Sequence, residues 1–151
     1  MKIVYSDDPI DSELLRFDTI FLAGPTPRNP DVKSWRPEAI QELIIQNFDG
    51  VILIPEFKSF QSRIDFLDQV NWERFWLENC KKIVCWVPRN MTNMPALTTN
   101  VEFGRYVTSG RLYYGRPDGA CHTNYLDWLY NLETKRNACL SLSDLIKEVL
   151  I

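Results

Sequence analysis

Histidine and paired metal ligands are scarce in this sequence. His122 is the only histidine, and Cys80, Cys85, Cys121 and Cys139 have none of the spacings that bind zinc. A zinc site and a Ser-His-Asp or Cys-His arrangement are therefore not expected. We expect the cysteines to be buried or unreactive, and His122 to be exposed in a loop without a catalytic role. Neither a metal nor a cofactor is expected.

Long apolar runs and an excess of basic residues are also absent. No run approaches the roughly 18 apolar residues of a membrane-spanning helix, and MKIVYSDDPI lacks the apolar centre of a signal peptide. We therefore expect a cytoplasmic protein with no membrane partner. The net charge of −3 argues against nucleic acid as a partner. A small anionic ligand stays open, because one or two arginines suffice to bind it.

Two nucleotide-binding fingerprints are missing as well. The sequence contains neither G-x-G-x-x-G nor G-x-x-x-x-G-K-[S/T], so it lacks the dinucleotide fingerprint and the P-loop. It has no repeats and no low-complexity segments. Its 151 residues, of which 45% are hydrophobic and 25% charged, are typical of one globular domain over residues 1–151.

Short apolar runs alternate with segments of helical period. In SWRPEAIQELIIQNF, Ser34 is the predicted cap, and Ala39, Ile40, Leu43 and Ile44 are predicted to share one face. The alternation predicts an open, mostly parallel α/β sheet of four or five strands, Rossmann-like or flavodoxin-like, with helices on both faces. The predicted strands are KIVYS, DTIFLAGP, DGVILIP, KIVCWVP and RLYYG, and the other predicted helices are FLDQVNWERFWLENC, TTNVEFGRYVTSG, NYLDWLYNLE and SLSDLIKEVL.

Ligands of such sheets bind beyond the carboxyl ends of the strands. Three predicted loops lie there: GPTPRNP, PEFKSFQSR and PRNMTNMPALTTN. In the first loop, Gly24 allows the backbone to approach a ligand, Thr26 can donate a hydrogen bond, and Arg28 can bind a phosphate or carboxylate. The alternative is a tight proline-rich turn with a solvated Arg28.

Glu102, in LTTNVEFGRYVTSG, has two interpretations. Thr99 and Glu102 fit the T-x-x-E capping box, in which the carboxylate reaches back to the cap amide. Alternatively, a carboxylate in the first helical turn is kept ionised by the positive end of the helix dipole. Such a carboxylate at the ligand edge can attack an anomeric carbon, as in retaining glycosidases. One side chain cannot fill both roles fully.

The segment DQVNWERFWLEN places four residues on one side of a helix, namely Asp68, Trp72, Trp76 and Asn79. Aromatic residues at this spacing are typical of a core, and the alternative is a cofactor-binding face. Glu73 lies next to this side. It is a candidate second acid only if its helix begins at the ligand edge of the sheet.

Several segments also carry a resemblance to a known family. In chain order they are FLAGPTPR, SWRPEAI, FDGVILIPE, DQVNWERFWLENCKKIVCWVPR and MPALTTNVEFGRYVTSGRLYYGRPD. Together, over roughly residues 18–132, they resemble the nucleoside 2-deoxyribosyltransferase-like proteins. The resemblance implies a flavodoxin-like Rossmann fold, and cleavage or transfer at the N-glycosidic bond of a deoxynucleoside or deoxynucleotide. It also implies a homo-oligomer, a dimer or larger, with sites completed by a neighbouring chain.

The resemblance implies roles for particular residues. Glu102, in VEFGRY, matches the nucleophile that attacks the sugar C1′ and forms a covalent deoxyribosyl intermediate. Arg28 and Arg89 are hypothesised to favour a phosphorylated ligand. The candidate substrate-binding residues are Gly24, Pro25, Thr26, Arg28, Trp72, Arg89, Thr98, Thr99 and Asn100.

The sequence departs from the family where acids or a tyrosine are expected. Lys82 and Ala96 stand at or near positions where family members carry an acid, and Phe21 stands where they carry a tyrosine. Losing a proton donor costs on the order of 10²–10⁴-fold in rate. We hypothesise that Glu73, or Asp68, replaces it.

Two alternatives to a deoxyribosyltransferase stay open. One is an N-glycosidase that hydrolyses nucleotides or NAD. The other is a nucleotide-binding module without catalysis, in which Glu102 caps its helix or holds a ribose hydroxyl. A binding module leaves the glycosidic bond intact over hours, whereas an enzyme releases free base.

Overall fold

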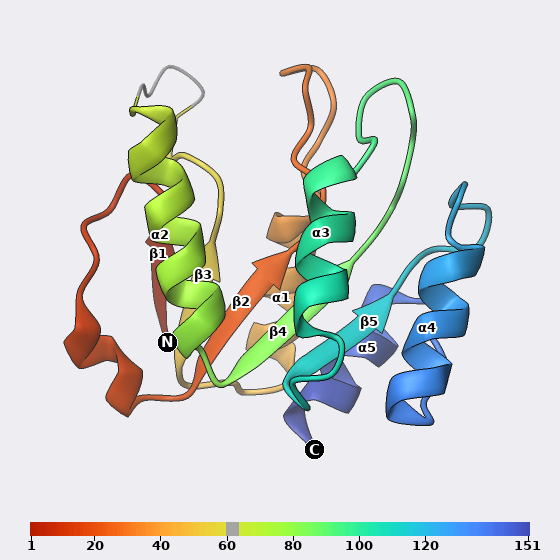
Figure 1. Ribbon diagram of the computed structural model, residues 1–151. Coiled ribbons are helices and arrows are strands. Elements are labelled where there is room, and N and C mark those ends of the chain that lie inside the picture. Colours follow the sequence, from red (N-terminus) through yellow and green to blue (C-terminus); the bar gives the residue numbers. More distant parts are fainter. Residues whose placement is uncertain (60–63) are drawn as a thin grey trace.

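The computed structural model describes residues 1–59 and 64–151, and its described part contains one five-stranded sheet (Figure 1). The sheet order is β1-β3-β2-β4-β5, and every neighbouring pair is parallel. This confirms the predicted α/β fold of flavodoxin-like or Rossmann-like type. The strands are β1 (Lys2–Tyr5), β2 (Thr19–Ala23), β3 (Val51–Ile54), β4 (Lys82–Trp86) and β5 (Leu112–Gly115).

Helices cover both faces of the sheet (Figure 1). In β2, Phe21 and Ala23 pack on the side of α2, α3 and α4, whereas Ile20 and Leu22 pack on the side of α1 and α5. Covered strands are apolar on both sides, which explains their continuous apolar sequence. The helices are α1 (Arg36–Ile45), α2 (Phe66–Asn79), α3 (Leu97–Tyr106), α4 (Asn124–Thr134) and α5 (Leu142–Leu150), with a short 3₁₀ helix at Ser12–Arg16. No helix in the described ranges is long and apolar enough to cross a membrane.

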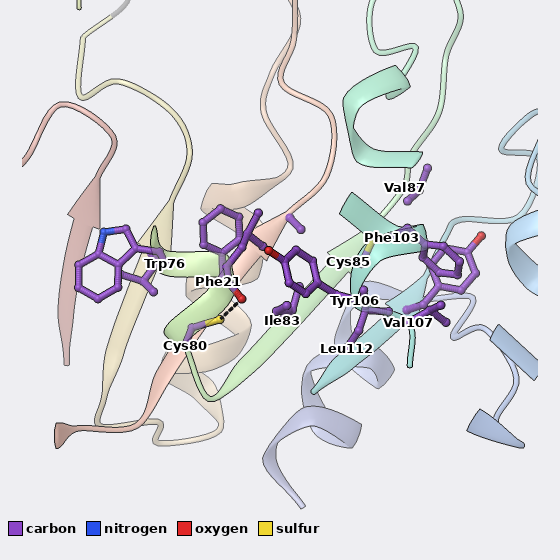
Figure 2. Packing of buried hydrophobic residues seen from close by; sticks show 14 of the residues in the cluster. Phe21, Trp76, Cys80, Ile83, Cys85, Val87, Phe103, Tyr106, Val107 and Leu112 are labelled. Atoms are coloured by element: carbon purple, nitrogen blue, oxygen red, sulfur yellow. Dashed lines mark hydrogen bonds between the residues drawn. The ribbon is translucent and has the colours of Figure 1, made fainter. Parts of the chain in front are cut away.

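The core beneath α2 and α3 is rich in aromatic side chains (Figure 2). The ring of Trp72 lies 6.1 Å from that of Phe21 and 6.2 Å from that of Trp76. Phe103 of α3 contacts Tyr114 of β5 with ring centroids 5.0 Å apart. Trp72 and Trp76 of α2 therefore form core, as their helical spacing indicated.

The start of α1 differs from the prediction. Trp35 is the residue before the helix, and Ser34 Oγ donates a hydrogen bond to Glu56 Oε1 at 2.7 Å. The helix thus begins one residue later than predicted, and Pro37 in its first turn favours this boundary, because its fixed φ suits that turn. Ile44 is 46% exposed, so the predicted apolar face of α1 is not buried along its whole length. Helix α5 packs on the Ala39 side of α1 and leaves Ile44 uncovered.

The order in which strands are added to the sheet reverses at β2, so that β3 and β4 lie on opposite sides of it. From β2 it passes to β3 on one side, and it then crosses to β4 on the other side of β2. The loops after β2 and β4 diverge at this switch point, which is where open α/β sheets bind ligands. Gly24 ends β2 here at φ 151°, and a Cβ on it would lie 2.3 Å from the Trp86 carbonyl oxygen.

Gly24→Ala is therefore expected to lower the free energy of unfolding by about 1–3 kcal/mol, because the added methyl group meets backbone. Gly104→Ala is the matched control. Gly104 lies within α3 with no atom near its missing Cβ, so alanine is expected to add about 0.5–1 kcal/mol. Urea unfolding of both variants measures the difference, and equal stabilities would contradict the close approach at Gly24.

Candidate active site

A pocket of about 360 Å³ opens at the carboxyl edge of the sheet, beside the switch point. The loop after β2, the helix α2 and the start of α3 supply most of its walls. Segments far apart in the sequence therefore meet at one place. The predicted site residues that line it are Gly24, Pro25, Thr26, Arg28, Glu73, Thr98, Thr99 and Glu102.

Glu73 reaches the pocket because α2 begins at the ligand edge. Helix α2 follows the loop after β3, and Asp65 caps it by accepting a hydrogen bond from the Leu67 amide at 2.8 Å. The condition set by the sequence for a second acid is thus met. Gln69 Nε2 donates a hydrogen bond to Glu73 Oε1 at 3.0 Å and holds that carboxyl beside the pocket.

Glu102 does not cap its helix. Helix α3 begins at Leu97, after Ala96 in a left-handed conformation with φ 58°, so Glu102 lies in the second turn. The predicted capping box with Thr99 and the predicted first-turn position are both wrong. The T-x-x-E pattern fits the sequence, but the helix starts two residues before Thr99, and the dipole effect fades beyond the first turn.

Burial, rather than the helix dipole, dominates the electrostatics of Glu102. The pKa of Glu102 is raised to about 7, first by burial and then by the charge of Glu73, while the Arg36 guanidinium opposes both. Burial also raises the pKa of Glu73, while the Gln69 hydrogen bond and Arg36 lower it. The two half-buried carboxyls therefore interact and hold protons to unusually high pH.

Arg36 supports the pocket from beneath, and the sequence analysis did not identify it. Its side chain is 1% exposed, forms an ion pair with Glu56, and donates to the Gly24 carbonyl at 2.8 Å and to Thr26 Oγ1 at 3.1 Å. Arg36 thereby fixes the loop after β2 onto α1. The sequence does contain a hint of this role, since Arg36 stands at the start of an otherwise apolar helical face. Arginine at a helix end is usually solvated, however, so this position alone does not predict burial.

Arg89 and Asn100 belong to the scaffold and do not line this pocket. Arg89 is 6% exposed, donates to the Pro95 carbonyl at 3.0 Å, and also donates to Asn100 Oδ1 and to the His122 carbonyl. These contacts hold the segment that leads into α3. With its guanidinium committed to them, Arg89 is not placed to bind a phosphate.

Trp72 is also absent from the lining of this pocket, because it packs in the core at 3% exposure. Phe21 is fully buried against Trp72, and Lys82 donates from the start of β4 to the Val149 carbonyl. Asp68 lines a different pocket. Among the described residues that line the pocket, Glu73 is therefore the acidic residue that accompanies Glu102.

A second pocket, of about 510 Å³, adjoins the first. The two share Thr26, Pro55 and Gln69 as lining residues. Glu56 and Ser34 line the second pocket, together with mostly apolar neighbours. The combined space suits a ligand of two parts, with one part beside the two carboxyls.

Among the residues that the structure describes, no group of three or more His, Cys, Asp or Glu is placed so that it could hold a metal ion. No protein-family model matches the chain, and no curated protein matches it.

Proposed function

We propose that this protein cleaves or transfers at the N-glycosidic bond of a (deoxy)nucleoside or deoxynucleotide, with Glu102 as nucleophile. One observation carries the proposal: two half-buried carboxyls, on α2 and α3, line one pocket at the switch point of a parallel sheet. Paired carboxyls of this kind are the working groups of retaining glycosidases. The resemblance in VEFGRY and FLAGPTPR points to the same chemistry.

In this mechanism the ionised carboxylate of Glu102 attacks the sugar C1′. A C–O bond forms, the C1′–N bond breaks, and its electron pair leaves with the base. Water or a second base then attacks C1′ and releases Glu102 as a carboxylate. With a pKa near 7, a substantial fraction of Glu102 is ionised at neutral pH.

Glu73 is the proposed proton donor to the departing base. Burial favours its protonated form, and the Gln69 hydrogen bond fixes its orientation. Catalysis then requires Glu102 ionised and Glu73 protonated, and the two groups titrate as a coupled pair. We expect kcat/KM to follow a bell-shaped pH profile with one limb near pH 7.

The experiment that tests the proposal is base release followed by chromatography. Deoxynucleosides, deoxynucleotides, ribonucleotides and NAD are incubated with the protein, with and without an acceptor base. Release of free base from at least one compound is expected, and its dependence on the acceptor separates a transferase from a hydrolase. If none reacts over hours while some raise the melting temperature, the enzyme proposal fails.

A nucleotide-binding module is the second candidate function. It is favoured by the raised pKa of Glu102, because a protonated carboxyl can donate a hydrogen bond to a ribose hydroxyl. Under this alternative the glycosidic bond stays intact, and the same chromatogram decides between the two.

Glu73→Gln is expected to lower base release by at least about 10²-fold, because glutamine keeps the shape but cannot donate the proton. The pH profile should also lose one of its two limbs, because only Glu102 then titrates. The matched control is Glu78→Gln on the same helix, whose carboxylate pairs with Arg74 and Arg105 away from the pocket. Unchanged turnover in Glu73→Gln would remove Glu73 from the mechanism.

Arg28→Ala is expected to weaken the binding of deoxynucleotides about tenfold more than that of deoxynucleosides. Arg28 lines the pocket, and the start of α3, which no side chain caps, lies on the same pocket and favours an anion. Dissociation constants for one nucleoside and its monophosphate measure the ratio. Equal weakening of both ligands would show that Arg28 does not recognise phosphate.

A further inference from the structure

The second pocket, of about 510 Å³, differs in charge from the first pocket that it adjoins. Arg28 and the start of α3 line the first pocket only, and both favour an anion there. Glu56 lines the second pocket only, and no Lys, Arg or His stands among the described residues that line it. A phosphate group is therefore favoured in the first pocket and disfavoured in the second.

The walls of the second pocket suit a planar, mostly apolar group. The half-buried apolar residues that line it are Pro27, Val32, Pro55 and Phe57. Aromatic and apolar side chains are the surfaces on which nucleobases stack in proteins. The pocket volume also falls within the range of about 300–1,000 Å³ that small-molecule sites occupy.

Glu56 brings one uncommitted acceptor oxygen to this pocket. Its Oε1 accepts hydrogen bonds from Arg36 Nη1 and from Ser34 Oγ, the latter at 2.7 Å. Among the described residues, no donor contacts Oε2 of Glu56, and the Glu56 side chain is 19% exposed whereas that of Arg36 is 1% exposed. Because an ionised carboxylate only accepts hydrogen bonds, this oxygen selects a ligand that carries a donor.

The proposed proton donor directs the base of the substrate towards the same pocket. Gln69 donates to Glu73 at 3.0 Å and lines both pockets. A base that takes its proton from Glu73 lies next to Gln69, while the sugar C1′ lies next to Glu102. With the phosphate at Arg28, the second pocket is the space that adjoins Gln69 on the other side.

We propose that the second pocket binds the base, and that Glu56 Oε2 selects a base with an exocyclic amino group. The placement of the base rests on the proposed function. Cytosine and adenine carry an amino donor at the position where uracil and hypoxanthine carry a carbonyl oxygen. An oxo base sets that oxygen against Glu56 Oε2, so that two acceptors face each other without a proton between them.

Calorimetric titration of the Glu102→Gln protein, in which the ligands are not expected to be cleaved, measures this selection. The ligands are the monophosphates of deoxycytidine, deoxyuridine, deoxyadenosine and deoxyinosine. We expect each amino nucleotide to bind at least about tenfold more tightly than its oxo counterpart, because it gains a hydrogen bond to a charged group. Deoxycytidine monophosphate with two methyl groups on the amino nitrogen keeps the ring, lacks the donor, and should bind as weakly as the deoxyuridine nucleotide. Equal affinities within both pairs, or no binding of any of the four, would overturn the proposal.

Two variants separate recognition by Glu56 from its ion pair with Arg36. Glu56→Gln is expected to remove the preference, because an amide both donates and accepts. Loss of the ion pair alone weakens all four nucleotides alike, so the ratio of affinities reports recognition. Glu38→Gln removes an equal charge from an exposed position of α1 outside both pockets, and it should keep the preference. Full preference in Glu56→Gln would show that Glu56 does not read the base.

The preference for amino nucleotides and the glycosidic activity fail separately. If the wild type releases no base while the amino nucleotides still bind more tightly, the base site stands and the glycosidic proposal fails. If base is released while amino and oxo nucleotides bind equally, the role of Glu56 fails and the glycosidic proposal stands.

Discussion

Glu102→Gln is expected to lower base release on the order of 10⁴-fold or more and, at the same time, to make the protein more stable above neutral pH. Activity is lost because an amide cannot form the glycosyl ester. Among the described residues that line the pocket, Glu73 is then the one carboxylate that is left. The gain in stability follows from the burial of the same carboxyl. The two effects have different causes and are measured separately.

The sign of the stability effect follows from proton binding. The pKa of Glu102 is about 7 in the folded protein and near the ordinary 4.5 in the unfolded chain. Between these values the folded protein binds more protons than the unfolded chain, so wild-type stability falls as pH rises from about 4.5 to 7. Glutamine carries no such proton. The variant's advantage should be small near pH 4.5 and reach on the order of 1–3 kcal/mol above pH 7.

Urea unfolding at pH 5 and pH 8 measures this difference. Glu133→Gln is the control, since Glu133 is an exposed carboxylate on α4 and its loss should change stability equally at both pH values. A Glu102→Gln protein less stable than wild type at pH 8 would show that the carboxylate stabilises the fold. Base release that persisted in the variant would show that Glu102 is not the nucleophile.

Arg36→Met is expected to lower the free energy of unfolding by about 3–5 kcal/mol. The substitution leaves the Glu56 carboxylate without its cation and the carbonyls of Leu22 and Gly24 without their donor. Methionine retains most of the side-chain volume, so the loss reports the broken polar contacts. The loop after β2 should lose its fixed position, because Arg36 also holds Thr26 Oγ1.

Chemical unfolding measures this loss against a matched exposed pair. Arg105→Met breaks the ion pair with Glu78, in which both side chains are more than one third exposed, and should cost less than about 1 kcal/mol. Combining Arg36→Met with Glu56→Gln should recover part of the loss, since the second change removes the uncompensated buried charge. A cost for Arg36→Met no larger than that for Arg105→Met would mean that the buried pair adds nothing to stability.

The sequence determined the order of strands and helices, because strands covered on both faces must be apolar throughout while helices need apolar residues only on one side. VILI and KIVCW are such runs, and both are strands buried in the sheet. Parallel strands place their following loops at one edge. For that reason, the pocket-lining positions of Thr26, Arg28, Thr98 and Glu102 follow from the sequence pattern.

Only the tertiary structure decided what surrounds these residues. The T-x-x-E pattern is local, but the start of α3 is set where Arg89 holds the Pro95 carbonyl, and Arg89 is itself held by the His122 carbonyl, 33 residues further along the chain. Glu102 is thereby moved from the first turn into a half-buried second-turn position. Likewise, Arg36 is buried because Glu56, 20 residues away, and the carbonyls at the end of β2 accept its hydrogen bonds. Burial and pairing depend on partners distant in the sequence, and local pattern does not record them.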